Sequence, residues 1–183
     1  MLVSLRTAPA LLTGVFALGF LTPLQGAAPS SLAGHWRYDA ARSTELSPWQ
    51  SFDLTVTIAG DKISLQRRLG WARRDFEDRT DIDLSQPVSI VAAPWWPDNR
   101  HLGAYASAEH PKRIRAQWLD EGRILRVSTD QVLATQQGPR EVNVLADYKV
   151  SASGTQLVVT ELRSTRNRPI VYVFNRVSPA AQP

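Results

Sequence analysis

Apolar and polar residues alternate along most of this chain. Phe52, Leu54, Val56 and Ile58 are separated by polar residues, which places four apolar side chains on one face of an expected strand. A period of two residues predicts half-buried β-strands, whereas the 3.6-residue period of helices is nearly absent. The pattern therefore predicts an all-β protein.

Three segments of the chain repeat a strand, a turn and a second strand. Their turns lie at residues 60–61, 120–122 and 153–154, and each turn contains a glycine. Alternating segments joined by such turns predict antiparallel hairpins that follow one another as a meander.

Three further strands are expected at residues 76–84, 88–91 and 170–177, which brings the total to about nine or ten. An antiparallel sheet of this size must curl to hide its edges, so the sequence predicts a barrel or half-barrel. A short helix expected at residues 40–46 could cover one end of the barrel.

The N-terminal segment has the layout of a secretory signal. A single basic residue, Arg6, precedes an apolar run over residues 8–24, and small residues follow the run. The interpretation divides the chain into a signal peptide (1–28), one β domain (29–177) and a disordered tail (178–183). It predicts a periplasmic or secreted protein.

A transmembrane anchor is the alternative interpretation of the leader. The apolar run is interrupted by Thr13, Gly14 and Gly19 and ends at Pro23, and it is short for a bilayer span. We therefore expect no stable membrane span after cleavage of the signal.

Composition narrows the classes of function. The 183 residues carry a formal net charge of +4 and contain no cysteine. This mild charge does not predict nucleic-acid binding, which requires a strongly basic surface. The lack of cysteine excludes disulfides and thiolate chemistry, and it fits a bacterial envelope protein.

Several short motifs resemble those of secreted bacterial lipocalin-like β-barrel proteins. They are a Gly34-His35-Trp36 opening, a W-x-x-x-G-x-x-L turn over residues 118–125, an S-x-x-G-x-x-L-x-V hairpin over residues 151–159, and a last strand with Tyr172 and Arg176. The resemblance implies a lipocalin-like barrel.

The resemblance also assigns three residues to the closure of the barrel. In lipocalins an arginine of the last strand packs across the tryptophan of the G-x-W motif, a cation-π contact. Here the residues that match are Gly34, Trp36 and Arg176. A core aromatic side chain is the favoured interpretation of Trp36, and a ligand floor is the alternative.

No catalytic motif is recognisable. The three histidines are His35, His101 and His110, and their spacing matches no standard set of metal ligands. We expect solvated loop histidines at positions 101 and 110. The sequence predicts no catalytic residue, no bound metal and no cofactor.

Two segments combine tryptophan with arginine. Residues 93–101 place Trp95 and Trp96 between prolines and close to Arg100, which suits either an inward plug or a contact with a partner. Residues 67–74 hold four arginines around a tryptophan, and five carboxylates follow. We expect these carboxylates to pair with the arginines across the hairpin.

Taken together, the patterns predict a non-catalytic protein that binds a small apolar or amphipathic molecule. Trp95, Trp96 and Arg100 would lie at the mouth of the barrel, and Trp118 and Tyr148 in its wall. The alternative is a protein-protein module, such as a protease inhibitor, in which the Trp95/Trp96 loop contacts a protein partner.

Overall fold

The structure is a computed structural model that describes residues 31–44, 49–93, 105–106 and 109–178. These residues form β-strands and one short 3-10 helix, which confirms the prediction of an all-β protein. The elements are β1 (Gly34–Tyr38), η1 (Ala40–Arg42), β2 (Ser51–Ala59), β3 (Lys62–Trp71), β4 (Arg74–Asp83), β5 (Ser89–Val91), β6 (Tyr105–Ala106), β7 (Lys112–Leu119), β8 (Ile124–Thr135), β9 (Gly138–Val150), β10 (Gln156–Arg163) and β11 (Ile170–Arg176).

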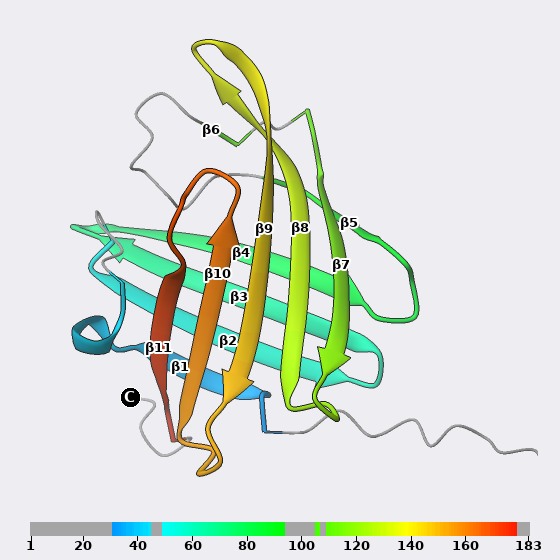
Figure 1. The fold of residues 1–183 in the computed structure, drawn as a ribbon. Coiled ribbons are helices and arrows are strands. Elements are labelled where there is room, and N and C mark those ends of the chain that lie inside the picture. The colour runs from blue at the N-terminus through cyan, green and yellow to red at the C-terminus, as the bar shows by residue number, and fades with distance from the viewer. Residues whose placement is uncertain (1–30, 45–48, 94–104, 107–108, 179–183) are drawn as a thin grey trace, which may run out of the picture.

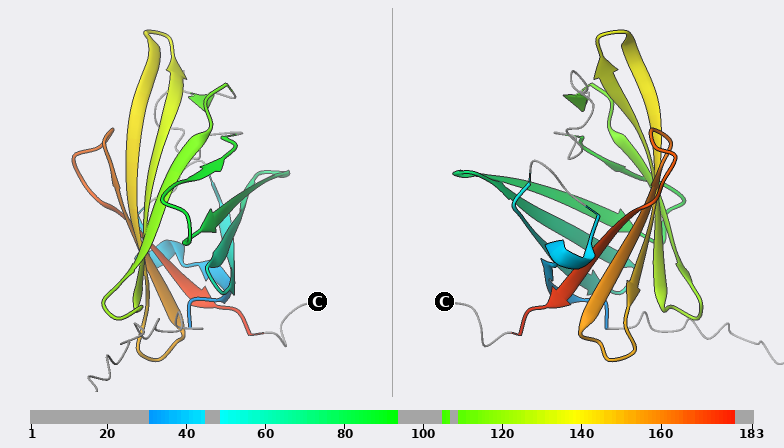
Figure 2. Two further views of the ribbon diagram at one scale, coloured as in Figure 1. Left: turned by 90° about the vertical axis from the view of Figure 1, so that its right-hand side faces the viewer. Right: turned by 60° about the vertical axis from the view of Figure 1, so that its left-hand side comes forward.

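All the strands belong to one antiparallel sheet with the order β4-β3-β2-β1-β11-β10-β9-β8-β7-β5, and β6 pairs with β8. In Figure 1 strands β2 to β4 cross behind strands β7 to β10, and Figure 2 shows these two halves facing each other. The sheet therefore forms a nearly closed barrel. Among the described residues no ladder joins its two ends, β4 and β5, although β4 approaches both β5 and β7.

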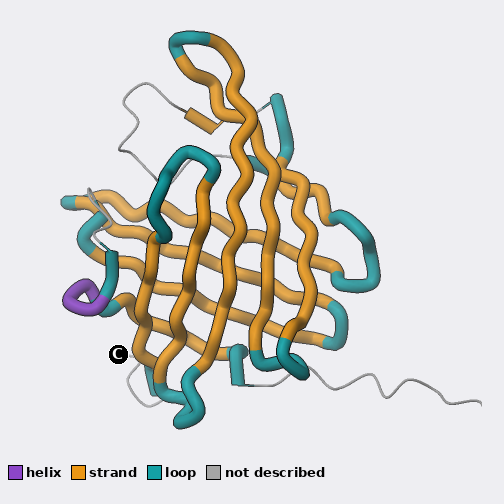
Figure 3. The backbone as a smooth tube through the Cα atoms, in the orientation of Figure 1, coloured by secondary structure: helices purple, strands orange, loops and turns teal. Residues whose placement is uncertain are grey.

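The first and last strands join the two halves of the sheet. Trp36 pairs with Arg176, and Tyr38 pairs with Phe174. The expected hairpins are present, with long ladders such as the one from Ser51 opposite Gly70 to Ala59 opposite Lys62. Figure 3 shows that the connecting loops lie at the ends of the strands.

The inward faces of the two halves form the hydrophobic core, as the period-two pattern requires. On β2, Phe52, Leu54 and Val56 are buried, and the residues between them are more exposed. Phe52 and Phe174, from the two halves, meet edge to face with ring centroids 5.0 Å apart. This apolar packing fills the end of the barrel where β1 meets β11.

Two details differ from the sequence-based expectations. β6 has two residues, too short to show a period, and it was not predicted. Of the helix expected at residues 40–46, the described part, residues 40–44, contains a 3-10 turn over Ala40–Arg42 without a buried residue, and residues 45–46 lie outside the described residues. This turn therefore does not plug the barrel.

The last strand is apolar on both faces, so both faces need cover. The inward residues Ile170, Tyr172 and Phe174 are buried in the core, and Val173 on the other face is 9% exposed. The segment after β1 runs along β11, where the Asp39 amide donates to the Val173 carbonyl at 2.8 Å and η1 lies against the strand. The cover comes from within the chain.

The closed end of the barrel is held by Trp36 and Arg176. Trp36 is fully buried, and the guanidinium carbon of Arg176 lies 4.1 Å from the centre of its ring. Arg176 also donates to the carbonyls of Ala33 at 2.9 Å and Gly154 at 2.7 Å. Gly34 makes this approach possible, because a Cβ at this position would lie 2.5 Å from a nitrogen of Arg176.

Candidate functional site

A group of polar and charged side chains lies inside the barrel, beyond the apolar core. The same alternation that buries Leu65 and Leu69 on β3 turns Arg67 inward between them. On β10 it places Glu161 and Arg163 on the face of Leu157 and Val159. The strands therefore carry charge into a space that is otherwise hydrophobic.

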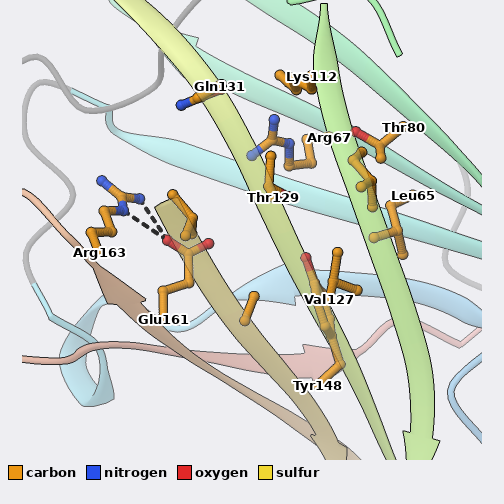
Figure 4. A pocket seen from close by; sticks show the side chains of 13 residues that line it. Leu65, Arg67, Thr80, Lys112, Val127, Thr129, Gln131, Tyr148, Glu161 and Arg163 are labelled. Carbon is orange, nitrogen blue, oxygen red and sulfur yellow. Dashed lines mark hydrogen bonds and ion pairs between the residues drawn. The ribbon is translucent and has the colours of Figure 1, made fainter. Parts of the chain in front are cut away.

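These side chains line a cavity of about 70 Å³. The residues drawn in Figure 4 come from both halves of the sheet, with Arg67 and Thr80 on one side and Glu161 and Arg163 on the other. Since a water molecule occupies about 30 Å³ of liquid volume, the cavity has room for a small polar group rather than a whole drug-sized molecule.

The first charged cluster joins β3, β4 and β7. Arg67 donates to Oδ2 of Asp78, and the Lys112 Nζ lies 3.6 Å from the same oxygen. Asp78 is 5% exposed and Lys112 is 5% exposed. Because no ladder joins β4 to β7 among the described strands, the ion pair between Asp78 and Lys112 bridges the seam of the barrel.

Burial changes the acid-base behaviour of Lys112. Desolvation, together with the nearby positive charge of Arg67, lowers the pKa of Lys112 to about 7. The ion pair with Asp78 opposes this shift. The ammonium group of Lys112 therefore gains or loses its proton near neutral pH.

The second charged cluster lies on β10. Arg163 donates to Oε2 of Glu161 through Nε at 3.0 Å and through Nη2 at 2.6 Å, and it reaches the Tyr172 hydroxyl at 3.3 Å. Both members of this pair are buried. A buried pair with this geometry is satisfied within the protein.

Tyr148 contributes a phenol to the cavity wall. Desolvation, and then the charge of Glu161, raise the pKa of Tyr148 to about 12, while Arg67 acts in the opposite direction. The phenol is therefore neutral at physiological pH, which suits a hydrogen-bonding role and not that of a general base.

Gln131 is the cavity residue with an unused donor. It is 6% exposed, and its Nε2 has no hydrogen-bond partner among the described residues. Arg113 on β7 pairs with Asp130 on β8, so continuing the register by one residue places Lys112 opposite Gln131. Cβ atoms of opposite residues are about 5 Å apart, which brings the amide and the ammonium to one part of the wall.

A wider groove of about 650 Å³ shares Gln131 with the cavity. Its lining combines the apolar residues Ile90, Pro111, Val132 and Val142 with polar and charged ones, which are His110, Arg113, Asp130, Gln131, Glu141, Asn143 and Ser164. Ile90 is 58% exposed, a high value for a large apolar side chain. Gln131 therefore lies where a small polar cavity meets a larger and more apolar groove.

The predicted binding residues are only partly placed by the structure. Tyr148 lines the cavity. Trp118 packs against the hydrophobic core, and its buried indole N–H has no partner among the described residues, but it does not line the cavity. Trp95, Trp96 and Arg100 lie outside the described residues.

The arginine-rich hairpin forms the expected ion pairs across its strands at Arg67 and Arg68. Arg68 lies 2.6 Å from Asp75 and 3.8 Å from Glu77. The pair of Arg67 and Asp78 is different, because it points into the barrel. The expected pairing across the hairpin is therefore present at Arg67, but the sequence analysis did not predict that this pair points inward.

Sequence reasoning did not identify Arg67, Lys112, Gln131, Glu161 and Arg163 as site residues. A signal was present, because each of them continues the apolar face of its strand at a spacing of two residues. That spacing indicates a buried polar position, and an unusual buried polar group is itself informative.

The described residues contain no group of three or more His, Cys, Asp or Glu side chains placed to hold a metal ion. No described helix has the length and apolar character that a bilayer crossing needs.

Comparison with known proteins identifies the fold. No protein-family model and no curated protein matches the sequence. A secretory abundant heat soluble (SAHS) protein from Ramazzottius varieornatus matches with a TM-score of 0.50 and 9% identity over 80% of this chain and 96% of that chain. The chain shares the fold of this barrel.

Two further solved structures are similar. SAHS protein 4 from the same organism has a TM-score of 0.50 and 8% identity, covering 83% of this chain and 99% of its own. A fatty-acid-binding protein from Manduca sexta has a TM-score of 0.46 and 10% identity, covering 80% and 99%. The two structures with a TM-score of 0.50 confirm the all-β barrel architecture, and this likeness concerns the fold alone.

Proposed function

We propose that this chain is an exported, lipocalin-like bacterial protein that binds a small amphipathic molecule and does not transform it. The observation that carries the proposal is the position of Gln131, a buried residue that borders both the polar cavity and the wider groove and whose Nε2 has no partner among the described residues. A buried N–H group needs an acceptor, because a buried donor without a hydrogen bond costs free energy.

The sizes of the two spaces support an amphipathic ligand. The cavity of about 70 Å³ accepts a small polar group, and the groove of about 650 Å³ falls in the range of small-molecule sites. An apolar body in the groove with a polar end at Gln131 would use both spaces.

A titration with N-phenyl-1-naphthylamine, an apolar fluorescent probe, tests the groove. The proposal predicts saturable binding of one probe per chain. Ile90→Lys should weaken this binding about tenfold, because the bound probe would no longer cover the apolar side chain of Ile90. Leu162→Lys is the matched control, since Leu162 is 49% exposed and lines neither the groove nor the cavity.

The outcomes separate clearly. Both variants replace exposed residues and should keep the melting temperature of the wild type. If the probe does not bind, or if both variants weaken it equally, the groove is not a binding site. The alternative, a protein partner held by Trp95, Trp96 and Arg100, would then become the better hypothesis.

Export is the second part of the proposal, and it predicts a mature N-terminus between Gly26 and Ser31. Cleavage beyond Ser31 would remove contacts of the folded domain, because Arg176 donates to the carbonyl of Ser31 and Leu32 is buried. N-terminal sequencing of the protein isolated from the periplasm or medium measures the position. An intact Met1 in the membrane pellet would contradict export as a cleaved protein.

A further inference from the structure

The charges inside the barrel are unequal. In the described part of the chain, five side chains that can carry a charge near neutral pH surround the cavity and its seam. They are Arg67, Lys112 and Arg163, which are basic, and Asp78 and Glu161, which are acidic. Buried charges are costly unless each has a counter-charge, so the interior carries one cation more than it can neutralise.

The geometry identifies Lys112 as that cation. Arg163 and Glu161 satisfy each other through two hydrogen bonds, and Arg67 donates directly to Asp78. The Lys112 Nζ is 3.6 Å from the oxygen of Asp78 that already accepts from Arg67. Charge-assisted hydrogen bonds are usually about 2.7–2.9 Å long. The contact of Lys112 with Asp78 is longer and is therefore weaker than that of Arg67.

A second donor lies beside Lys112. Gln131 occupies the opposite position on β8, and its Nε2 has no partner among the described residues. The wall of the cavity thus presents an ammonium and an amide N–H about one strand spacing apart. A group with two acceptor oxygens and a negative charge matches both donors.

We infer that the polar end of the bound molecule is an anion of the carboxylate class, held by Lys112 and Gln131. The inference rests on the proposed function and specifies the class of ligand. It makes Lys112 the residue that distinguishes an acid from the corresponding alcohol.

The surroundings of Lys112 predict a proton-linked signature. Desolvation and the charge of Arg67 on β3 lower the pKa of Lys112 to about 7, Asp78 on β4 opposes them, and the Glu161–Arg163 pair lies across the cavity. A bound carboxylate would raise this pKa towards its ordinary value of 10.5. Binding should then take up about one proton at about pH 8, and almost none at about pH 5.5.

Isothermal titration calorimetry with decanoate measures both affinity and proton uptake. Titrations of the mature protein at about pH 8 in HEPES and in Tris, which differ in ionisation enthalpy, give the number of protons from the difference in heat. We expect uptake with decanoate and none with 1-decanol, the neutral probe of equal chain length.

Three variants locate the effect. Lys112→Met should weaken decanoate about tenfold to a hundredfold and abolish proton uptake, whereas 1-decanol is unaffected. Gln131→Leu should weaken decanoate and keep the uptake. The matched control is Lys149→Met, which removes an exposed lysine from β9 and should change neither quantity.

The results separate the inference from the proposed function. Equal affinity for decanoate and 1-decanol without proton uptake overturns the inference and leaves a binding protein for neutral molecules. If neither compound binds, the proposed function fails as well. Should Lys112→Met not fold, proton uptake in the wild type and in Gln131→Leu still decides the question.

Discussion

Replacing Trp36 with alanine should lower the free energy of unfolding by about 3–5 kcal/mol, the usual cost of truncating a fully buried aromatic side chain. Trp36 is 0% exposed, and its indole N–H donates to the Leu32 carbonyl at 3.0 Å. The change therefore removes core packing and a buried hydrogen bond together. Denaturant unfolding of both proteins measures the difference.

Arg176→Ala is the comparison for this variant. It removes the cation over the Trp36 ring and the bonds to the carbonyls of Ala33 and Gly154, at a smaller cost on the order of 1–2 kcal/mol. A Trp36→Ala protein with the midpoint of the wild type would show that closure of the barrel does not depend on this residue.

Asp78→Asn should be comparably destabilising, by about 3–5 kcal/mol at pH 6, because it leaves the buried Lys112 and the half-buried Arg67 without their shared carboxylate. The side chain of Asp78 is 1% exposed, and its Oδ2 is the partner of both Arg67 and Lys112. Loss of this charge removes the attraction that holds β4 near β7 and adds repulsion between the two cations.

The loss should depend on pH. Lys112 has a folded pKa of about 7, below its ordinary value of 10.5, so between these values the unfolded chain binds more protons and stability rises with pH. Without Asp78 the folded pKa falls further. The deficit of Asp78→Asn should therefore be larger at about pH 6 than at about pH 9.5, where Lys112 is neutral in both folded proteins.

A second substitution tests the cause. Adding Lys112→Met to Asp78→Asn removes one of the two uncompensated cations and should recover part of the lost stability at low pH. Thermal melts of the four proteins at the two pH values provide a double-mutant cycle. A deficit that is independent of pH and not relieved by Lys112→Met would assign the loss to packing instead of charge.

The period-two pattern was sufficient to predict the strands. β2, β4 and β11 lie within a few residues of their expected positions, because alternation and turn glycines are local signals. The two-residue β6 gave no such signal. The helical turn that the structure describes, Ala40–Arg42, is shorter than the expected helix, and the chain on either side of this turn is hydrogen-bonded to β11.

The candidate site was much harder to predict. Tyr148 was identified as a wall residue from its strand position, and it lines the cavity. Arg67 was expected only to pair with a carboxylate across the hairpin, because five acidic residues follow the arginine cluster in sequence. Its inward position follows from the spacing to Leu65 and Leu69, a signal that charge composition obscured.

The sequence by itself determined the all-β class, the order of the hairpins and the face on which the apolar residues of each strand lie. These properties depend on the two-residue period of a strand and on turns, which act over a few residues. Only the tertiary structure decided that β3, β4 and β7 bring Arg67, Asp78 and Lys112 together, and that Gln131 borders both the cavity and the groove. Those contacts join residues far apart in the chain, and their charge balance depends on how the sheet curls and where its seam falls.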